Sequence, residues 1–203
     1  MVTEIELKYS LDDARARALL QERRLAGNIL TPFVTKTVDD VYYDTPDSRV
    51  AQAGYALRIR RKGDETALQL KSLTPAAGAW HRRRELHIPS ADPQHPDRWP
   101  HTPEARFLRK VIGGRPLQPL FNVHQQRHEA QVLDESGAPF GLLSLDQVRW
   151  EAHGRSKEAW EMEIELLPGG DEARLRALAD ALQKMTGLHP QTISKYEQGL
   201  ALL

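Results

Sequence analysis

The stretch Glu4-Ile5-Glu6-Leu7-Lys8 decides how this chain folds. Successive side chains of a β-strand point to opposite faces of the strand. Glu4, Glu6 and Lys8 therefore share one face, and Ile5 and Leu7 share the other. The apolar face has to be buried, whereas the charged face has to meet water, opposite charges or a ligand. The opening of the chain thus predicts a strand with one buried apolar face.

The same alternation recurs further along the chain, in one acidic and two basic segments. The acidic segment is Glu161-Met162-Glu163-Ile164-Glu165, and the basic segments are Arg58-Ile59-Arg60 and Gln69-Leu70-Lys71. Several strands with charged faces of opposite sign predict a barrel with a charged interior. Such an interior would suit a polyanion that is held through divalent cations.

Length and composition narrow the possible classes of protein. The 203 residues make one large domain or two small ones, and they suffice for a real core. The formal net charge is zero, which gives no bias toward a nucleic acid or a membrane as partner. The absence of cysteine excludes disulfides, thiolate catalysis and cysteine zinc sites.

The N-terminal sequence MVTEIELKYS contains no apolar signal core. No run approaches the roughly 18 apolar residues of a membrane span. We therefore expect a soluble, cytoplasmic protein.

The pattern of apolar residues, caps and turns predicts about eight strands, with helices between and after them. A turn around Gly63-Asp64 joins two of the strands, and the proline-rich segment 89–103 is expected to be a surface loop. Pro190 is expected in the first turn of the last helix. The arrangement predicts a single α+β domain over residues 1–203. The expected strands are 3–9, 37–44, 55–62, 66–72, 80–88, 120–134, 140–150 and 158–167, and the expected helices are 12–25, 104–111, 171–185 and 190–203.

The acidic residues of the alternating segments form the first candidate site. If the strands close into a barrel, the carboxylates converge inside it and repel one another. Hard cations such as Mg²⁺ or Mn²⁺ would relieve that repulsion. The alternative is a solvated outer face of an open sheet, and the pattern alone does not decide between the two. The acidic set comprises Glu4, Glu6, Glu161, Glu163 and Glu165, with Asp146 and Glu85 as weaker members.

The basic residues form the second candidate site. The planar fork of arginine matches phosphate oxygens in a bidentate way. The alternative is cross-strand ion pairing with the glutamates, which the spacing alone slightly favours. A cavity rich in both signs stabilises a fold poorly, so its presence is easier to understand when a ligand and a metal complete it. The basic set comprises Lys8, Arg58, Arg60, Lys71, Arg83 and Arg127.

Other site motifs are absent from the sequence. There is no GxxxxGK[ST] loop, no GxGxxG and no HExxH. The eight histidines are expected at the surface, and Arg82 and Arg84 are expected on a solvated outer face.

An ordered series of motifs resembles the CYTH family, also called triphosphate tunnel metalloenzymes. Glu4-x-Glu6-x-Lys8 matches the ExExK signature of that family, and the other matches follow in order along nearly the whole chain. They are 40–46 (DVYYDTP), 57–60 (LRIR), 69–71 (QLK), Arg83-x-Glu85, Arg127, Asp146, the Glu161–Glu165 triplet and Ser194-Lys195.

The resemblance implies an eight-stranded antiparallel β-barrel, the triphosphate tunnel, with helices packed outside. It also implies a small-molecule triphosphate substrate and Mg²⁺ or Mn²⁺ as cofactor, with no nucleic acid or membrane partner. By position, it assigns Lys71 and Tyr42 to orienting the attacking water. It assigns phosphate binding to Lys8, Arg58, Arg60, Lys71, Arg83, Arg127 and Lys195, and metal binding to Glu4, Glu6, Asp146, Glu161, Glu163 and Glu165.

Three activities occur in the family: hydrolysis of inorganic triphosphate, hydrolysis of thiamine triphosphate, and cyclisation of ATP as in class IV adenylate cyclases. The run of motifs most resembles bacterial inorganic triphosphatases, so hydrolysis to diphosphate and phosphate is the first expectation. A non-catalytic module that binds polyphosphate or a nucleotide is the alternative from another class. Enzymes of this kind often form homodimers, and the sequence leaves the assembly open.

Overall fold

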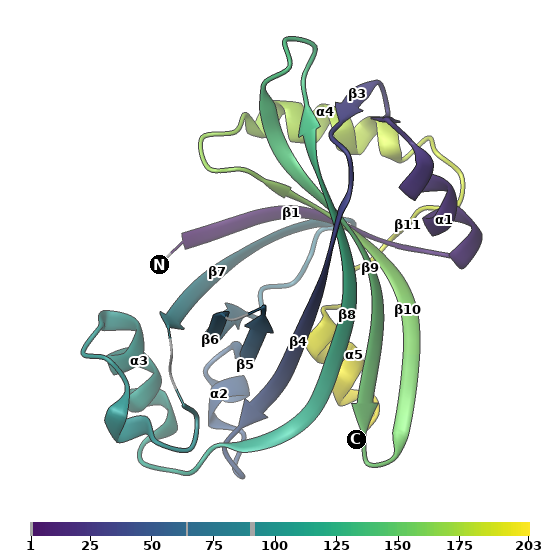
Figure 1. The fold of residues 1–203 in the computed structure, drawn as a ribbon. Helices are drawn as coiled ribbons and strands as arrows, with labels where there is room; N and C mark the ends of the chain where they lie inside the picture. Colours follow the sequence, from purple (N-terminus) through teal and green to yellow (C-terminus); the bar gives the residue numbers. More distant parts are fainter. Residues whose placement is uncertain (1, 64, 90–91) are drawn as a thin grey trace.

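A computed structural model of the chain describes residues 2–63, 65–89 and 92–203 (Figure 1). In this part of the chain, eight strands close into an antiparallel barrel, as the resemblance implies. Their order around the barrel is β8-β4-β5-β6-β7-β1-β10-β9, and β9 pairs back onto β8. The strands are β1 (Val2–Leu11), β4 (Val34–Asp44), β5 (Tyr55–Lys62), β6 (Glu65–Ser72), β7 (Trp80–Pro89), β8 (Gln118–Leu133), β9 (Pro139–Ala152) and β10 (Arg155–Leu166).

Strand β1 joins the two ends of the chain. It pairs with β7 on one side and with β10 on the other. The register places Glu6 opposite Glu165, and Lys8 opposite Glu163. Paired residues in adjacent strands point to the same face of a sheet. The charged faces of β1 and β10 therefore lie side by side, although they come from opposite ends of the sequence.

The outer face of the barrel is covered by helices on two sides (Figure 1). Helices α1 (Asp13–Gln21) and α4 (Glu172–Leu182) pack over β1, β9 and β10, where Leu7, Met162 and Ile164 are fully buried. Helices α2 (Arg49–Gln52) and α3 (Pro103–Ile112) pack over β5 to β7, against Leu57 and Leu70. The apolar face of each strand therefore forms the outer core, as the alternation predicts, and the polar face lies inside.

The last helix, α5 (Lys195–Leu200), closes one end of the barrel. Tyr196 packs there with Tyr42, Phe121 and Trp150 in an apolar cluster. The Trp150 indole N–H donates to the Lys195 backbone oxygen at 2.9 Å. This cluster seals the end of the barrel where α5 lies.

Three predicted helices are shorter than expected, and the one predicted over 171–185 ends at Leu182. The helix predicted over 12–25 ends at Gln21, and the chain turns back in a hairpin of β2 (Arg24–Leu25) and β3 (Asn28–Leu30). Ala26 and Gly27 have φ angles of 47° and 88°, so a left-handed turn lies where the pattern predicts a helix end. The helix predicted over 190–203 contains only α5, because β11 (His189–Pro190) pairs with β1 instead.

The segments predicted as connections contain further structure. A short 3₁₀-helix, η1 (Pro96–Arg98), lies within the predicted loop 89–103. The predicted turn at Gly63-Asp64 falls in part outside the described residues, since Asp64 is not among them. Within the described residues, no helix is both long and apolar enough to span a membrane.

Candidate active site

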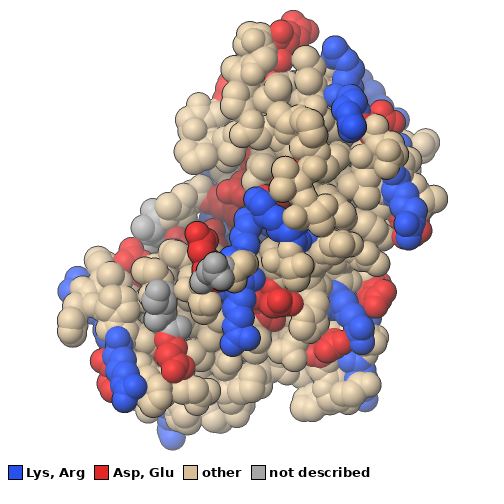
Figure 2. All heavy atoms as spheres, in the orientation of Figure 1, with Lys and Arg blue, Asp and Glu red and all other residues tan. Residues whose placement is uncertain are grey.

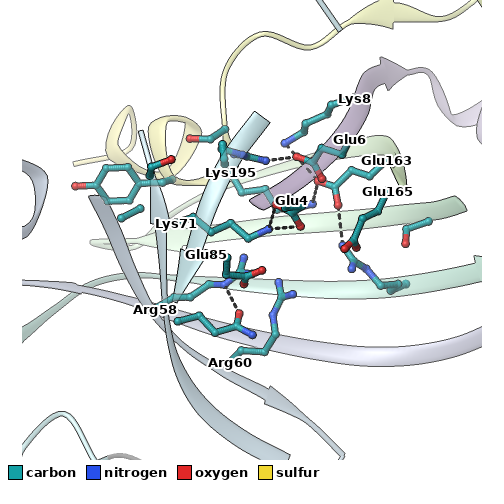
Figure 3. Close-up of a pocket in the computed structure, with 18 of the residues that line it drawn as sticks. Glu4, Glu6, Lys8, Arg58, Arg60, Lys71, Glu85, Glu163, Glu165 and Lys195 are labelled. Carbon is teal, nitrogen blue, oxygen red and sulfur yellow. Dashed lines mark hydrogen bonds and ion pairs between the residues drawn. The ribbon is translucent and has the colours of Figure 1, made fainter. Parts of the chain in front are cut away.

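The barrel encloses a cavity of about 210 Å³. Each of the eight barrel strands contributes side chains to its wall, and α5 contributes two more. Figure 2 shows basic and acidic side chains next to each other around a hollow on this face of the molecule, and Figure 3 shows the lining side chains converging. Eight basic and six acidic residues line the cavity: Lys8, Arg58, Arg60, Lys62, Lys71, Arg83, Arg127 and Lys195, and Glu4, Glu6, Glu85, Glu129, Glu163 and Glu165.

The alternation of β1 places its charges inside the barrel. Glu4, Glu6 and Lys8 are 9%, 3% and 1% exposed, and all three line the cavity. Ile5 and Leu7 point outward into the core beneath the helices. Between the two alternatives left by the sequence, the structure therefore excludes a solvated outer face for this strand.

One wall of the cavity is formed by two arginines of β5. Arg60 donates from Nε and Nη2 to the two carboxylate oxygens of Asp40, at 2.8 and 2.7 Å. Arg58 donates from Nε to Gln69 at 3.0 Å and from Nη1 to Asp40 at 3.4 Å. Burial alone would raise the pKa of Asp40, but the two guanidinium groups outweigh it and hold that pKa well below its usual value.

Two carboxylates of β1, those of Glu4 and Glu6, are each paired with a cation. Lys71 Nζ contacts both oxygens of Glu4, at 2.7 and 2.8 Å, and Arg83 donates from Nη2 to Glu6. Burial would raise the pKa of Glu4, but Lys71 and Arg83 outweigh it and lower that pKa. The lowered pKa keeps Glu4 ionised, which suits a carboxylate that accepts a cation.

A network of buried ion pairs, called the ladder below, surrounds the Lys195 side chain at the start of α5. Lys195 Nζ lies 3.0 Å from Asp146, 3.0 Å from Glu161 and 2.7 Å from Glu163. Burial would lower the pKa of Lys195, but these three carboxylates raise it well above its usual value. Further contacts complete the ladder: Lys8 lies 3.0 Å from Glu161, and Arg127 contacts Asp146 at 2.6 Å and Glu163 at 2.9 Å.

Two carboxylates of the cavity differ from the rest. Glu85 and Glu165 line the cavity, but neither makes a hydrogen bond or an ion pair with another described side chain. Burial, reinforced by Glu4, Glu6 and Glu85, raises the pKa of Glu165 to about 7. Carboxylates this close repel one another, and a bound divalent cation would relieve that repulsion.

The donor set fits a hard divalent cation such as the family implies. The acidic side chains that line the cavity all offer carboxylate oxygens, and oxygen is the ligand atom that Mg²⁺ and Mn²⁺ prefer. Glu165 has no ion-pair partner among the described side chains, whereas Glu4 and Glu6 would exchange Lys71 and Arg83 for the metal. As they stand, the described side chains form no preassembled group of three metal ligands. A bound cation would therefore rearrange these ion pairs.

The predicted phosphate-binding and metal-binding residues divide into two groups by position. All seven predicted phosphate-binding residues line the cavity. Among the predicted metal ligands, Glu4, Glu6, Glu163 and Glu165 also line it. Asp146 and Glu161 are fully buried in the ladder and do not belong to the cavity wall. What each of these residues binds stays a prediction.

The predicted catalytic pair, Lys71 and Tyr42, lines the same cavity. No hydrogen bond joins the two side chains in the described structure. The Tyr42 hydroxyl accepts a hydrogen bond from Arg58 at 3.5 Å, and its ring stacks on Phe121 at a centroid distance of 4.7 Å. Tyr42 therefore lies at the sealed end and Lys71 beside Glu4, and their role stays a prediction.

Several residues of the site lie outside the predicted sets. Glu129 bridges Lys36 and Lys62 near the mouth, and Asp40 holds the arginine wall. The period-two pattern of 37–44 places Asp40 on the face of Tyr42, which was the available signal. His81 is also buried, at 3% exposed, and contacts the Gln191 backbone oxygen. The expectation of a surface position is wrong for this histidine, because the segment after β11 covers it.

A closed antiparallel barrel around a tunnel of mixed charge defines the class of protein. The chain belongs to the CYTH family, because the family model of the CYTH domain matches residues 3–200. It is 28% identical over 132 residues to an inorganic triphosphatase of Haemophilus influenzae. The match covers 63% of this chain and 35% of that protein, so the chain spans about a third of the length of this relative.

Solved structures share the fold along nearly the whole chain. A Hippeastrum protein described as a putative adenylyl cyclase with a dominant triphosphatase activity has a TM-score of 0.67 at 23% identity, over 98% of this chain and 95% of that one. A putative adenylate cyclase of Bacillus halodurans has a TM-score of 0.63 at 19% identity, over 98% of both chains. At these identities the likeness shows the fold alone.

Proposed function

We propose that this chain hydrolyses inorganic triphosphate to diphosphate and phosphate, with the help of a divalent cation. The observation that carries this proposal is the barrel cavity of about 210 Å³, whose wall holds eight basic and six acidic side chains. The named activity of the Haemophilus influenzae relative and the membership of the CYTH family support it.

The charges of the cavity suit a linear polyanion. Arg58, Arg60 and Arg127 offer planar forks that match the oxygens of successive phosphates. The carboxylates would repel a triphosphate by themselves, so they are useful only to a substrate that arrives with cations. Both halves of the cavity therefore have a role when a metal and a triphosphate bind together.

The shape of the cavity favours an inorganic substrate over an organic one. Tyr196 of α5 packs with Tyr42 and Phe121 at one end of the barrel. Apolar and aromatic side chains make up the smaller part of the cavity wall, which includes Tyr42, Ala56, Leu73, Leu142 and Tyr196. A base or a thiazolium ring would need an apolar or aromatic surface of its own. Charged side chains make up most of the wall, so such a group would find little apolar surface beside the phosphates.

Each part of the wall has a task in the proposed reaction. Glu4, Glu6 and Glu165 would hold the divalent cation, which neutralises charge that develops on the leaving diphosphate. Arg58 and Arg60 grip phosphate oxygens and keep the chain in line. The pKa of Glu165 is raised to about 7 in the metal-free protein, so Glu165 would give up its proton when it binds the cation.

The water that attacks the terminal phosphate needs a donor and an acceptor to orient it. Lys71 and Tyr42 are the proposed pair, since both line the cavity beside the groups that grip the phosphates. The Lys71 ammonium stands beside Glu4, and the Tyr42 hydroxyl stands beside Arg58.

A parallel assay tests the proposal. Phosphate release is measured from inorganic triphosphate, thiamine triphosphate and ATP, each with Mg²⁺, Mn²⁺ or a chelator, and the ATP samples are also assayed for cyclic AMP. Metal-dependent release that is fastest from inorganic triphosphate is the expected result. Cyclic AMP without phosphate release would replace the proposal by a cyclase, and no product from any substrate would leave a binding module.

A further inference from the structure

Asp40 is a buried carboxylate on which three donors converge. Its side chain is 0% exposed and takes no part in the cavity wall. Arg60 contacts both of its oxygens, and Arg58 and Gln125 contact Oδ2, at 3.4 and 3.0 Å. The carboxylate therefore connects two strands of the barrel, β5 and β8, to the centre of β4.

The contacts of Asp40 fix the direction of two guanidinium groups. A guanidinium carries five N–H donors in one rigid plane, so holding one edge of the plane orients the others. Asp40 occupies the Nε and Nη2 side of Arg60. Arg58 is held at Nε by Gln69 and at Nη1 by Asp40 and Tyr42. Arg60 Nη1 and Arg58 Nη2 have no partner among the described residues.

The free edges belong to side chains that line the cavity. Figure 3 shows Arg58 and Arg60 on one side of the cavity, across from Lys8 and Lys195. We propose that Asp40 is a positioning residue, which holds the forks of Arg58 and Arg60 in the orientation that grips the phosphate chain. This inference rests on the proposed function, and it adds a residue that does not itself touch substrate.

Charge alone argues against Asp40 as an aid to phosphate attraction. A carboxylate next to two cations lowers the positive potential that a triphosphate would meet. A buried ion pair also stabilises a fold poorly when apolar residues of similar volume could replace it. Its value is therefore geometric, because misplacing a gripping group by about 1 Å can cost about a hundredfold in rate.

The Asp40→Asn variant separates orientation from charge. Asparagine has nearly the same shape, but its amide offers one acceptor in place of two and no charge. If Asp40 positions the arginines, kcat falls about tenfold or more while KM changes less than threefold, because attraction of the anion is kept. If Asp40 only dampens the positive potential, KM falls and kcat stays within twofold of the wild-type value, and this result overturns the proposal.

The neighbouring Asp39→Asn variant is a matched control. Asp39 is on the same strand but points outward, where its 44% exposed side chain contacts His124. Its kinetic constants are expected to equal those of the wild-type protein. Circular dichroism and the melting temperature establish that each variant is folded at the assay temperature, so that kcat refers to folded protein.

Two further measurements distinguish positioning from a structural role. In the Arg60→Lys background, which lacks the fork, Asp40→Asn should lower kcat much less than in the wild-type background, whereas a structural role gives equal losses. If Asp40→Asn does not fold, Gln125→Leu takes its place. A folded Gln125→Leu protein with kcat lowered about threefold supports the proposal, and unchanged kcat overturns it.

Nuclear magnetic resonance of the arginine Nε–H groups tests positioning without activity. Two slowly exchanging Nε–H signals from Arg58 and Arg60 are expected in the wild-type protein. The Arg60 signal should be lost or averaged in Asp40→Asn and kept in Asp39→Asn. If the wild-type protein releases no phosphate, the proposed function fails, and this readout still decides whether Asp40 orients the arginines. Unchanged signals in Asp40→Asn would overturn the inference.

Discussion

Glu163→Gln removes one charge from the ladder behind α5 without removing volume. Glu163 Oε1 accepts from Lys195 at 2.7 Å, and Oε2 accepts from Arg127 at 2.9 Å. The glutamine amide has one acceptor oxygen, so its NH₂ group would face one of these cations, a donor against a donor. Lys8, at 3.6 Å from the same carboxylate, also loses part of its counter-charge.

The cost of this substitution follows from the burial of the network. The Glu163 side chain is only 14% exposed. Burial would raise its pKa, but Lys195, Lys8 and Arg127 outweigh burial and hold that pKa well below its usual value. Removing one partner of a buried ion pair lowers the free energy of unfolding by about 3–5 kcal/mol. Because glutamine keeps one acceptor oxygen, we expect a loss of about 3 kcal/mol for this variant. For a chain of this size, that value lowers the melting temperature by about 6–12 °C.

Urea unfolding of the metal-free protein, followed by tryptophan fluorescence, measures this loss. Glu158→Gln is the matched control, since Glu158 lies on the same strand with a 60% exposed side chain, and its loss is expected to stay below about 0.5 kcal/mol. Because Glu163 also belongs to the cavity wall, phosphate release by folded Glu163→Gln protein should fall about a hundredfold. A stability within 1 kcal/mol of the wild-type value, or a normal rate, would refute this reasoning.

Three further predictions test other parts of the molecule. Arg58→Ala removes charge-assisted contacts worth about 1.5–3 kcal/mol each, so kcat/KM for inorganic triphosphate should fall at least tenfold; unchanged kinetics would place Arg58 outside the binding site. The raised pKa of Glu165, about 7, means that the folded protein holds this proton more tightly than the unfolded chain does. Its contribution to stability is therefore present below pH 4.5 and lost as the pH rises through 7, and Glu165→Gln should remove that loss from the metal-free unfolding curves; an identical pH dependence in both proteins would contradict it. Gly199→Ala places a methyl group against the Phe121 ring and should destabilise the protein by about 1–3 kcal/mol, with faster hydrogen exchange in α5; wild-type exchange rates would show that α5 tolerates the methyl group.

The barrel and its charged interior were largely predictable, because they depend on a local rule. A period of two places Glu4, Glu6 and Lys8 on one face whatever the rest of the chain does. No single strand predicts that the barrel closes, and we inferred the closure from the ordered series of family motifs. The burial of Leu7, Met162 and Ile164 outside the barrel follows from the same rule.

The errors fall where tertiary contacts override local preference. Pro190 pairs with β1 in a short strand instead of starting a helix, because Tyr9 offers it a free strand edge. His81 is buried because the segment around Gln191, distant in sequence, lies across it. Neither contact leaves a trace in the local pattern of residues.

The sequence predicted which residues form the site better than it predicted which of them form ion pairs. The spacing placed Glu4 and Lys71 in one cavity, but their ion pair depends on the register of β1 and β6, which lie on the two sides of β7. Asp146 was grouped with the cavity carboxylates, whereas Arg127 and Lys195 enclose it completely. Which partner a buried charge takes depends on distances of a few ångström that a sequence does not specify.

The most direct test of the proposed function is the product balance for inorganic triphosphate. The wild-type protein is incubated with inorganic triphosphate and Mg²⁺, with Mn²⁺, or with a chelator, and phosphate and diphosphate are quantified together. A tunnel phosphatase that depends on a divalent cation predicts equal amounts of the two products with metal and none with the chelator. No product with either metal, or the same rate in the chelator, would contradict it.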